Sequence, residues 1–125
     1  MKQILAIIRM SKINETKEAL NEIGLPSFTA SGKVQGRGKG RGDYLERTKS
    51  TVDDKEYISL STGEPRLKTK RLLHIIVADE KVDLAVQTII KANQTGKSGD
   101  GKIFIVPTIE AHRVRTRETG DNVLD

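Results

Sequence analysis

The sequence predicts an α+β fold of the ferredoxin-like type, a βαββαβ sandwich in which two helices cover one face of a four-stranded antiparallel sheet. Three observations predict it. The chain has 125 residues, the size of a single domain, which we expect to span residues 1–125. Each half of the chain has the pattern of a strand, a helix and a second strand. A long, charged and glycine-rich stretch separates the two halves.

The first half opens with the apolar run 4–8, which is typical of a central strand. A helix follows, with Ser11 as its candidate N-cap and Gly24 at its end, shortly before a proline. The second strand is expected over residues 27–34. Three apolar helix residues are spaced to share one face: Ile13, Leu20 and Ile23.

The second half repeats this order. A strand is expected over residues 72–77, and Asp79 or Asp83 can begin a helix that ends at Gly96. The closing strand is expected over residues 103–106. The helix presents an apolar face made of four residues: Val82, Val86, Ile89 and Ile90.

The second face of the predicted sheet has no helix to cover it. All four predicted strands are apolar at most positions, and two helices cover only one face of a four-stranded sheet. An apolar sheet face of this size is normally buried on a partner. The sequence therefore predicts an oligomer.

Composition excludes several classes of protein. The chain contains no cysteine, which excludes disulfides and thiolate metal sites and fits an intracellular protein. No apolar run approaches the ~20 residues of a membrane span. The short apolar run after Lys2 is not a signal peptide. We expect a cytoplasmic protein.

The net charge of +5 is concentrated in the middle of the chain. Between Gly36 and Arg71, ten lysines and arginines stand against six acidic residues, a net of +4. This excess favours an anionic ligand or partner near the segment, and a solvated basic loop is the alternative.

Residues 36–69 read as a mobile arm that contacts a partner, because a stretch of this length without apolar periodicity is usually functional. Its first part, 36–42, alternates glycine with basic residues, as an RNA-binding tract of the RGG type does. It lacks repeats and interleaved aromatic residues, which argues against that role.

The segment 95–107 carries the strongest chemical signal. Three glycines and two lysines lie in a short turn before the last strand, a combination that suits a polyanion such as a nucleoside triphosphate. Gly96 to Lys102 fits the first seven positions of a Walker A loop. Ile103 then takes the place of the Ser or Thr, and a strand follows where a helix is required. A P-loop NTPase is disfavoured, and a plain glycine-rich turn remains an alternative.

These segments resemble the PII-type nitrogen-regulatory signalling proteins. Residues 1–9 match the family's first strand, residues 95–102 match its B-loop signature, and Arg113-Val-Arg115-Thr matches the Arg-x-Arg-Thr of its C-terminal segment, here 112–125. The matches cover about three quarters of the chain. The arm, 36–69, lies where the family has its T-loop.

Within this family, the chain is most similar to the second type of PII-like protein encoded in nitrogen-fixation operons. Three short segments carry this likeness: Gly36-Arg-Gly-Lys39, Lys70-Arg-Leu-Leu73 and Asn93-Gln-Thr-Gly96.

The resemblance implies a homotrimer that binds ATP or ADP in clefts between subunits. Gly99, Gly101 and Lys102 would hold the phosphates. Arg113 and Arg115 would reach the phosphates from the neighbouring subunit.

The resemblance also implies the rest of the ligand cleft. Thr29, Gly38 and Ile76 would line the base and sugar side. Arg9 and Lys70 would pair with the carboxylates of 2-oxoglutarate, with Mg²⁺ as a further effector.

Two departures from the family pattern matter. Gly40 stands where the family usually has a glutamine that organises Mg²⁺ and 2-oxoglutarate, which leaves binding of that effector open. His74 replaces an acidic residue that contacts the adenine in many relatives; it either bonds the base or faces the surface between subunits. His112 is expected at the surface. Tyr44 and Tyr57 have no secure counterpart to the tyrosine that some relatives modify.

The leading hypothesis is therefore a non-catalytic sensor of nitrogen status. Its T-loop would bind a target, most simply nitrogenase, which it would inhibit when ammonium is available, alone or with a first-type PII-like paralogue. The alternatives are another target, such as an ammonium transporter or an enzyme of glutamine metabolism; a basic ferredoxin-like RNA-binding module; and an ATP-hydrolysing enzyme. With two Phe and two Tyr, an aromatic RNA platform is poorly supplied, so nucleic acid is disfavoured as a partner.

Overall fold

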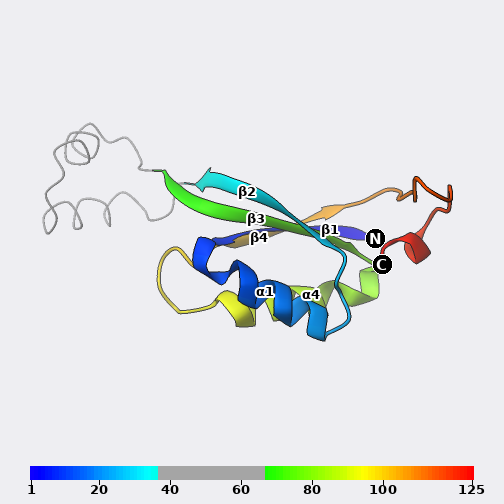
Figure 1. The fold of residues 1–125 in the computed structure, drawn as a ribbon. Helices are drawn as coiled ribbons and strands as arrows, with labels where there is room; N and C mark the ends of the chain where they lie inside the picture. The colour runs from blue at the N-terminus through cyan, green and yellow to red at the C-terminus, as the bar shows by residue number, and fades with distance from the viewer. Residues whose placement is uncertain (37–66) are drawn as a thin grey trace, which may run out of the picture.

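The computed structural model describes residues 1–36 and 67–125. They form one antiparallel four-stranded sheet, with strand order β2-β3-β1-β4, and two helices that lie together on one face of it (Figure 1). This confirms the ferredoxin-like α+β sandwich. The main elements are β1 (Lys2–Arg9), α1 (Ile13–Glu22), β2 (Phe28–Gly36), β3 (Lys68–Val77), α4 (Val82–Asn93) and β4 (Lys102–Pro107). Three short 3₁₀ helices complete them: Met10–Lys12, Asp79–Lys81 and Asp121–Val123.

Strand β1 lies inside the sheet and sets its register. It pairs with β3 from Lys2↔Val77 to Arg9↔Lys70, and with β4 from Lys2↔Pro107 to Ile7↔Lys102. Residues that are directly opposite in an antiparallel pair project from the same face. The register therefore brings Arg9 and Lys70 together, at the end of the sheet where β4 begins.

The hydrophobic core lies between the sheet and the two helices. Side chains alternate along each strand, so every second residue faces the helices. The core is aliphatic, as the scarcity of aromatic residues requires, and its fully buried side chains include Ile4, Ile8, Leu20, Leu73 and Ile89.

The strands are longer than their apolar runs. Strand β3 begins at Lys68, four residues before the expected start at Leu72, and β2 continues to Gly36, which pairs with Lys68. The expected strand missed these residues because they are polar and basic. The two ends of the stretch expected as an arm, Gly36 and residues 68–69, belong to strands, and 37–66 lie outside the described residues.

The expected N-cap of the first helix is wrong. Ser11 lies within the 3₁₀ turn Met10–Lys12; Lys12 is the N-cap of α1, and no side-chain hydrogen bond caps it. The other end is as expected, because Gly24 adopts φ +81° and donates its N–H to Asn21 O at 3.1 Å.

The expected apolar face of α4 is confirmed for Val82, Val86 and Ile89, which pack on the core, but not for Ile90. The buried residues of α4 are Ala85, Ile89 and Asn93, whereas Ile90 is 37% exposed. The helix also ends at Asn93 rather than at Gly96. Asn93 is buried because it contacts α1. Its Nδ2 donates to Thr16 Oγ1 at 2.9 Å and to Ile89 O at 2.8 Å. A small residue and a polar one therefore occupy the centre of the interface between the helices.

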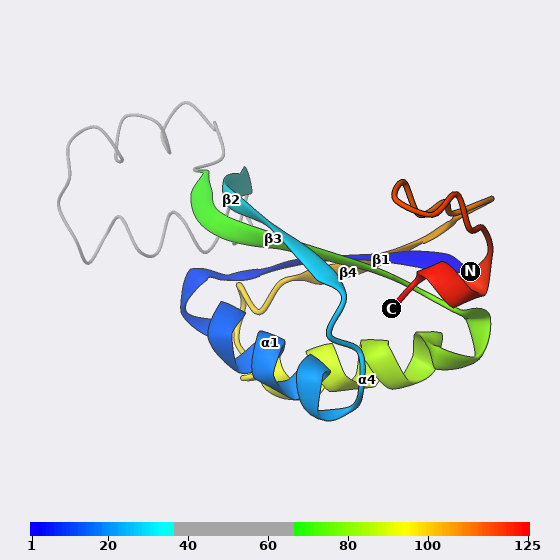
Figure 2. The ribbon, with the colours of Figure 1, turned by 45° about the vertical axis from the view of Figure 1, so that its right-hand side comes forward.

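The other face of the sheet is apolar and is not covered by the helices (Figures 1 and 2). Leu5 lies opposite both His74 and Phe104, so these side chains share this face, and Phe104 is 49% exposed. We call this surface the open face; by register it comprises Leu5, Ile7, Leu72, His74, Ile76, Phe104 and Val106. In the described part of the chain, no helix is long and apolar enough to cross a membrane.

Candidate functional site

The B-loop, residues 95–102, connects α4 to β4, ends on the first residue of β4 and has a backbone suited to anions. Gly99 and Gly101 adopt φ +99° and +112°, while Ser98 before them and Asp100 between them are not among the residues with positive φ. Alternating signs of φ turn successive N–H groups toward a common concavity, which binds anions. Gly101 is sterically required, because a Cβ there would overlap the carbonyl oxygen of Ile7.

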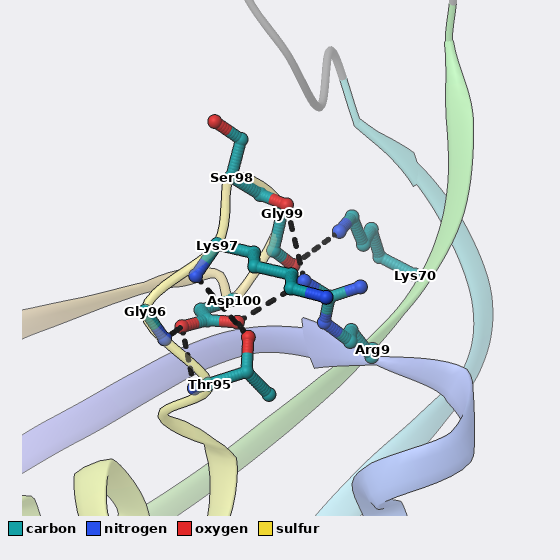
Figure 3. A network of polar contacts seen from close by, with 8 residues as sticks. All are labelled: Arg9, Lys70, Thr95, Gly96, Lys97, Ser98, Gly99 and Asp100. Carbon is teal, nitrogen blue, oxygen red and sulfur yellow. Dashed lines mark hydrogen bonds and ion pairs between the residues drawn. The ribbon is translucent and has the colours of Figure 1, made fainter.

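Asp100 lies at the centre of the loop (Figure 3). Its Oδ2 accepts the backbone N–H of Thr95 at 2.7 Å and of Gly96 at 2.9 Å. Its Oδ1 accepts the Thr95 hydroxyl at 2.5 Å and Arg9 Nη2 at 3.1 Å. The Thr95 hydroxyl, the Thr95 backbone N–H and the other donors hold the pKa of this carboxyl well below its usual range. Asp100 is therefore ionised at neutral pH.

Two cations from neighbouring strands contact the same loop (Figure 3). Arg9 Nη2 donates to Ser98 O at 3.0 Å, and Lys70 Nζ donates to Gly99 O at 2.7 Å. Lys70 is buried, with 7% of its surface exposed. Burial and the nearby Arg9 guanidinium lower the pKa of Lys70, and the charge of Asp100 opposes this shift.

These contacts orient the loop's N–H groups. A trans peptide is planar, with its C=O and N–H pointing in opposite directions. Because Ser98 O and Gly99 O point toward the cations, the N–H groups of Gly99 and Asp100 point away from them. Among residues 1–36 and 67–125, neither of these N–H groups, nor that of Gly101, donates a hydrogen bond. The loop thus presents unsatisfied N–H donors, from which an anion can accept hydrogen bonds.

Lys102 follows as the first residue of β4 and is exposed. The structure therefore gathers five of the expected ligand residues at one end of the sheet: Arg9, Lys70, Gly99, Gly101 and Lys102. The sequence did not reveal that Thr95 and Asp100 hold the loop together by hydrogen bonds. The only signal was an acidic residue between two glycines.

The remaining expected residues lie at the other end. Thr29 is opposite His74, and both line a hollow of about 220 Å³ with Ile76 and the C-terminal residues His112 and Leu124. Along β3, Ile76 is six residues from Lys70, about 20 Å at ~3.3 Å per residue. The C-terminal segment, orange to red, also lies at this end, away from the yellow B-loop (Figures 1 and 2). One chain does not bring the two groups of residues together.

The C-terminal segment fixes one arginine and leaves another exposed. Arg113 donates to Glu118 Oε1 at 3.0 Å and to Asn122 O at 3.3 Å. The Thr116 hydroxyl and then Arg113 lower the pKa of Glu118. Arg115 is exposed at the turn between Arg113 and Glu118, and it has no polar partner among the described residues. Its position suits contact with a ligand or another chain.

The histidines differ in their environments. His112 is at the surface, as expected, with Nε2 3.0 Å from Glu110 Oε1. His74 is half-buried on the open face and lines the 220 Å³ hollow, so its position fits both roles that the sequence left open. Gly38, Gly40, Tyr44 and Tyr57 lie outside the described residues.

The chemistry of the site suits phosphate better than a bare metal ion. Unsatisfied N–H groups and lysines fit the oxygens of a nucleotide. Both carboxylate oxygens of Asp100 already accept hydrogen bonds, and no cluster of three or more acidic or histidine residues in the described segments could hold a metal ion.

The sequence is similar to those of known proteins. The model of the family "Nitrogen regulatory protein P-II" matches residues 1–118. A protein of Methanobacterium ivanovii described as "Nitrogen fixation nifHD region GlnB-like protein 2" is 43% identical over 124 residues, 99% of each chain. The "Nitrogen regulatory protein P-II" of Cereibacter sphaeroides is 36% identical over 124 residues, 99% of this chain and 100% of that protein. The resemblance to second-type PII-like proteins of nitrogen-fixation operons is confirmed.

The fold is shared as well. The crystal structure of Arabidopsis thaliana PII bound to citrate is similar, with a TM-score of 0.72 and 28% sequence identity. The likeness covers 97% of this chain and 89% of that one. Sequence and fold agree that the chain belongs to the P-II family of nitrogen regulatory proteins.

Proposed function

We propose that this chain is a non-catalytic, cytoplasmic sensor of nitrogen status. It binds ATP or ADP through the B-loop, responds to 2-oxoglutarate, and regulates a target protein through residues 36–69. The observation that carries the nucleotide proposal is the row of unsatisfied N–H groups from Gly99 to Gly101, followed directly by the exposed Lys102. Oriented backbone donors beside lysines are the recurring solution for binding a phosphate chain.

A homotrimer completes the site. The phosphate-binding end and the end with Thr29, Ile76, Arg113 and Arg115 are too far apart in one chain to share a nucleotide. In a trimer, the end of one subunit that carries Thr29, Ile76, Arg113 and Arg115 can lie against the B-loop of its neighbour. The open face supplies an apolar surface for such an assembly. In this arrangement Arg113 and Arg115 reach the phosphates in trans.

The second effector is proposed to be 2-oxoglutarate, with Arg9 and Lys70 as its cations. Both side chains already contact the B-loop, so a dicarboxylate must share or replace contacts to Asp100 and Gly99. The relative bound to citrate supports carboxylate binding by this fold. Mg²⁺ would enter with the nucleotide, because this ion is usually held by substrate phosphates and waters with only one or two carboxylates.

The proposed target is nitrogenase. Support comes from the relatives named for the nitrogen-fixation region. A first-type PII-like paralogue is a candidate co-subunit, and an ammonium transporter or an enzyme of glutamine metabolism is the alternative target. Copurification from cells shifted to ammonium tests this choice: recovery of nitrogenase with the protein supports it, and recovery of a transporter instead contradicts it.

The nucleotide site is tested with Arg115→Ala. In wild type, ATP at 100 times its dissociation constant should add about 2.7 kcal/mol to stability per site. Arg115→Ala should remove most of the resulting rise in melting temperature, because the variant lacks a phosphate contact, and should keep the trimer intact. Lys91→Ala is the control, since it removes one positive charge from an exposed position on α4.

Thermal melts with and without ATP, at one protein concentration, measure the effect. An unchanged ATP shift in Arg115→Ala, or an equal loss in Lys91→Ala, would show that the site lies elsewhere.

A further inference from the structure

We infer that Asp100 is a positioning residue for nucleotide phosphates, a role that rests on the nucleotide binding proposed above. An acidic side chain inside an anion-binding loop needs an explanation, because its charge repels phosphate. The contacts of Asp100 supply one. It accepts four hydrogen bonds, three from Thr95 and Gly96 at the start of the loop and one from Arg9 on β1.

These contacts fix both ends of the loop. Thr95 and Gly96 are held to Asp100 across the turn, and the Thr95 hydroxyl in turn accepts the N–H of Lys97 at 3.3 Å. Arg9 joins the carboxylate to Ser98 O, so β1 fixes the position of the loop against the sheet. The donors of Gly99 and Gly101 are therefore oriented before a ligand arrives. A site that is ordered in advance avoids the entropy of ordering at the moment of binding.

Charge and position predict opposite results for Asp100→Asn. If the carboxylate acted only through its charge, removing it would strengthen the binding of ATP. If it positions the loop, binding weakens. An asparagine amide keeps one acceptor oxygen and turns the other into a donor, which then faces the N–H groups of Thr95 and Gly96 or the guanidinium of Arg9.

The experiment measures dissociation constants by calorimetry for ATP and for adenosine, which lacks phosphates. Asp100→Asn should weaken ATP by at least about tenfold and change adenosine by less than about twofold, since the loss of a hydrogen-bonded charge is worth at least a factor of ten. Thr95→Val should weaken ATP selectively, and Thr95→Ser, which keeps the hydroxyl, should bind ATP as wild type does. Asp83→Asn, which removes one exposed carboxylate on α4, should bind both ligands normally.

Amide hydrogen exchange on the ligand-free protein gives a second readout. Residues 95–101 should exchange faster in Asp100→Asn than in wild type, while α4 and β1 keep their protection. Unchanged or tighter ATP binding in Asp100→Asn, or equal losses for ATP and adenosine, overturns the inference and leaves the proposed function standing. A wild-type protein that binds ATP no better than adenosine overturns the proposed function itself, and the positioning role with it.

Discussion

At the scale of single residues, Gly101 shows how one position can serve both the fold and the ligand. Its φ of +112° orients the B-loop donors, and its missing side chain lets the loop lie against the Ile7 carbonyl. Gly96 has a similar φ of +84°, but a Cβ there would meet no atom within 4 Å. Both glycines therefore need a positive φ, but only Gly101 lacks space for a Cβ.

Gly101→Ala should lower the free energy of unfolding by about 1–3 kcal/mol and abolish ATP binding, because the added methyl must separate the loop from β1. Gly96→Ala carries only the cost of positive φ, about 1 kcal/mol, and should retain ATP binding. Denaturant unfolding at a fixed protein concentration, with an ATP titration, compares the two. Equal losses of stability in both variants would contradict the proposed contact with Ile7.

At the scale of elements, the two helices are joined by a buried polar contact. Thr16 on α1 is fully buried; its hydroxyl donates to Lys12 O at 2.7 Å and accepts Asn93 Nδ2 from α4. Most buried polar groups are paired, and the hydrogen bond between Asn93 and Thr16 holds the two helices in a defined packing. It also places the end of α4, from which the B-loop departs.

Thr16→Val should destabilise the protein by about 1–2 kcal/mol, because it removes an acceptor from a buried amide while conserving volume. Thr88→Val on α4 is the matched control. Its hydroxyl makes the same type of intrahelical bond, to Leu84 O at 2.7 Å, without a partner on α1. Thermal melts should show a shift for Thr16→Val and almost none for Thr88→Val. Similar melting temperatures would mean that the contact between the helices contributes little.

Elements also show what the sequence could predict. Apolar runs and glycines revealed all four strands and both α-helices of residues 1–36 and 67–125, because burial and turns leave local signals. The basic residues at the start of β3 gave no such local signal. Lys70 is covered by the B-loop and not by an apolar layer. On α4 the sequence did not reveal Ala85 and Asn93 as buried positions, because these residues carry little hydrophobic signal. Glycines and lysines marked the B-loop, whereas its contact with Arg9 depends on residues about 90 positions apart.

At the scale of the whole molecule, two features support the proposed trimer. The open face exposes apolar side chains, and the expected nucleotide residues are divided between the two ends of the sheet. In a trimer, neighbouring subunits would bury the apolar open face. A cleft between subunits would bring the two groups of nucleotide residues together. Assembly and nucleotide binding should therefore be lost together.

Phe104→Asp tests this coupling, because it places a charge on the open face, where Phe104 is 49% exposed in the single chain. Burying an unpaired carboxylate in an apolar interface is strongly unfavourable. Light scattering should show a trimer for wild type and monomers for Phe104→Asp, and the monomer should bind ATP at least about tenfold more weakly, since Arg113 and Arg115 of a neighbour are lost. Leu84→Asp is the control: Leu84 is 48% exposed, but on α4, away from the open face. It should remain trimeric and bind ATP normally. A wild-type monomer at micromolar concentration, or a monomeric Phe104→Asp that keeps full ATP affinity, would show that one chain forms the site alone.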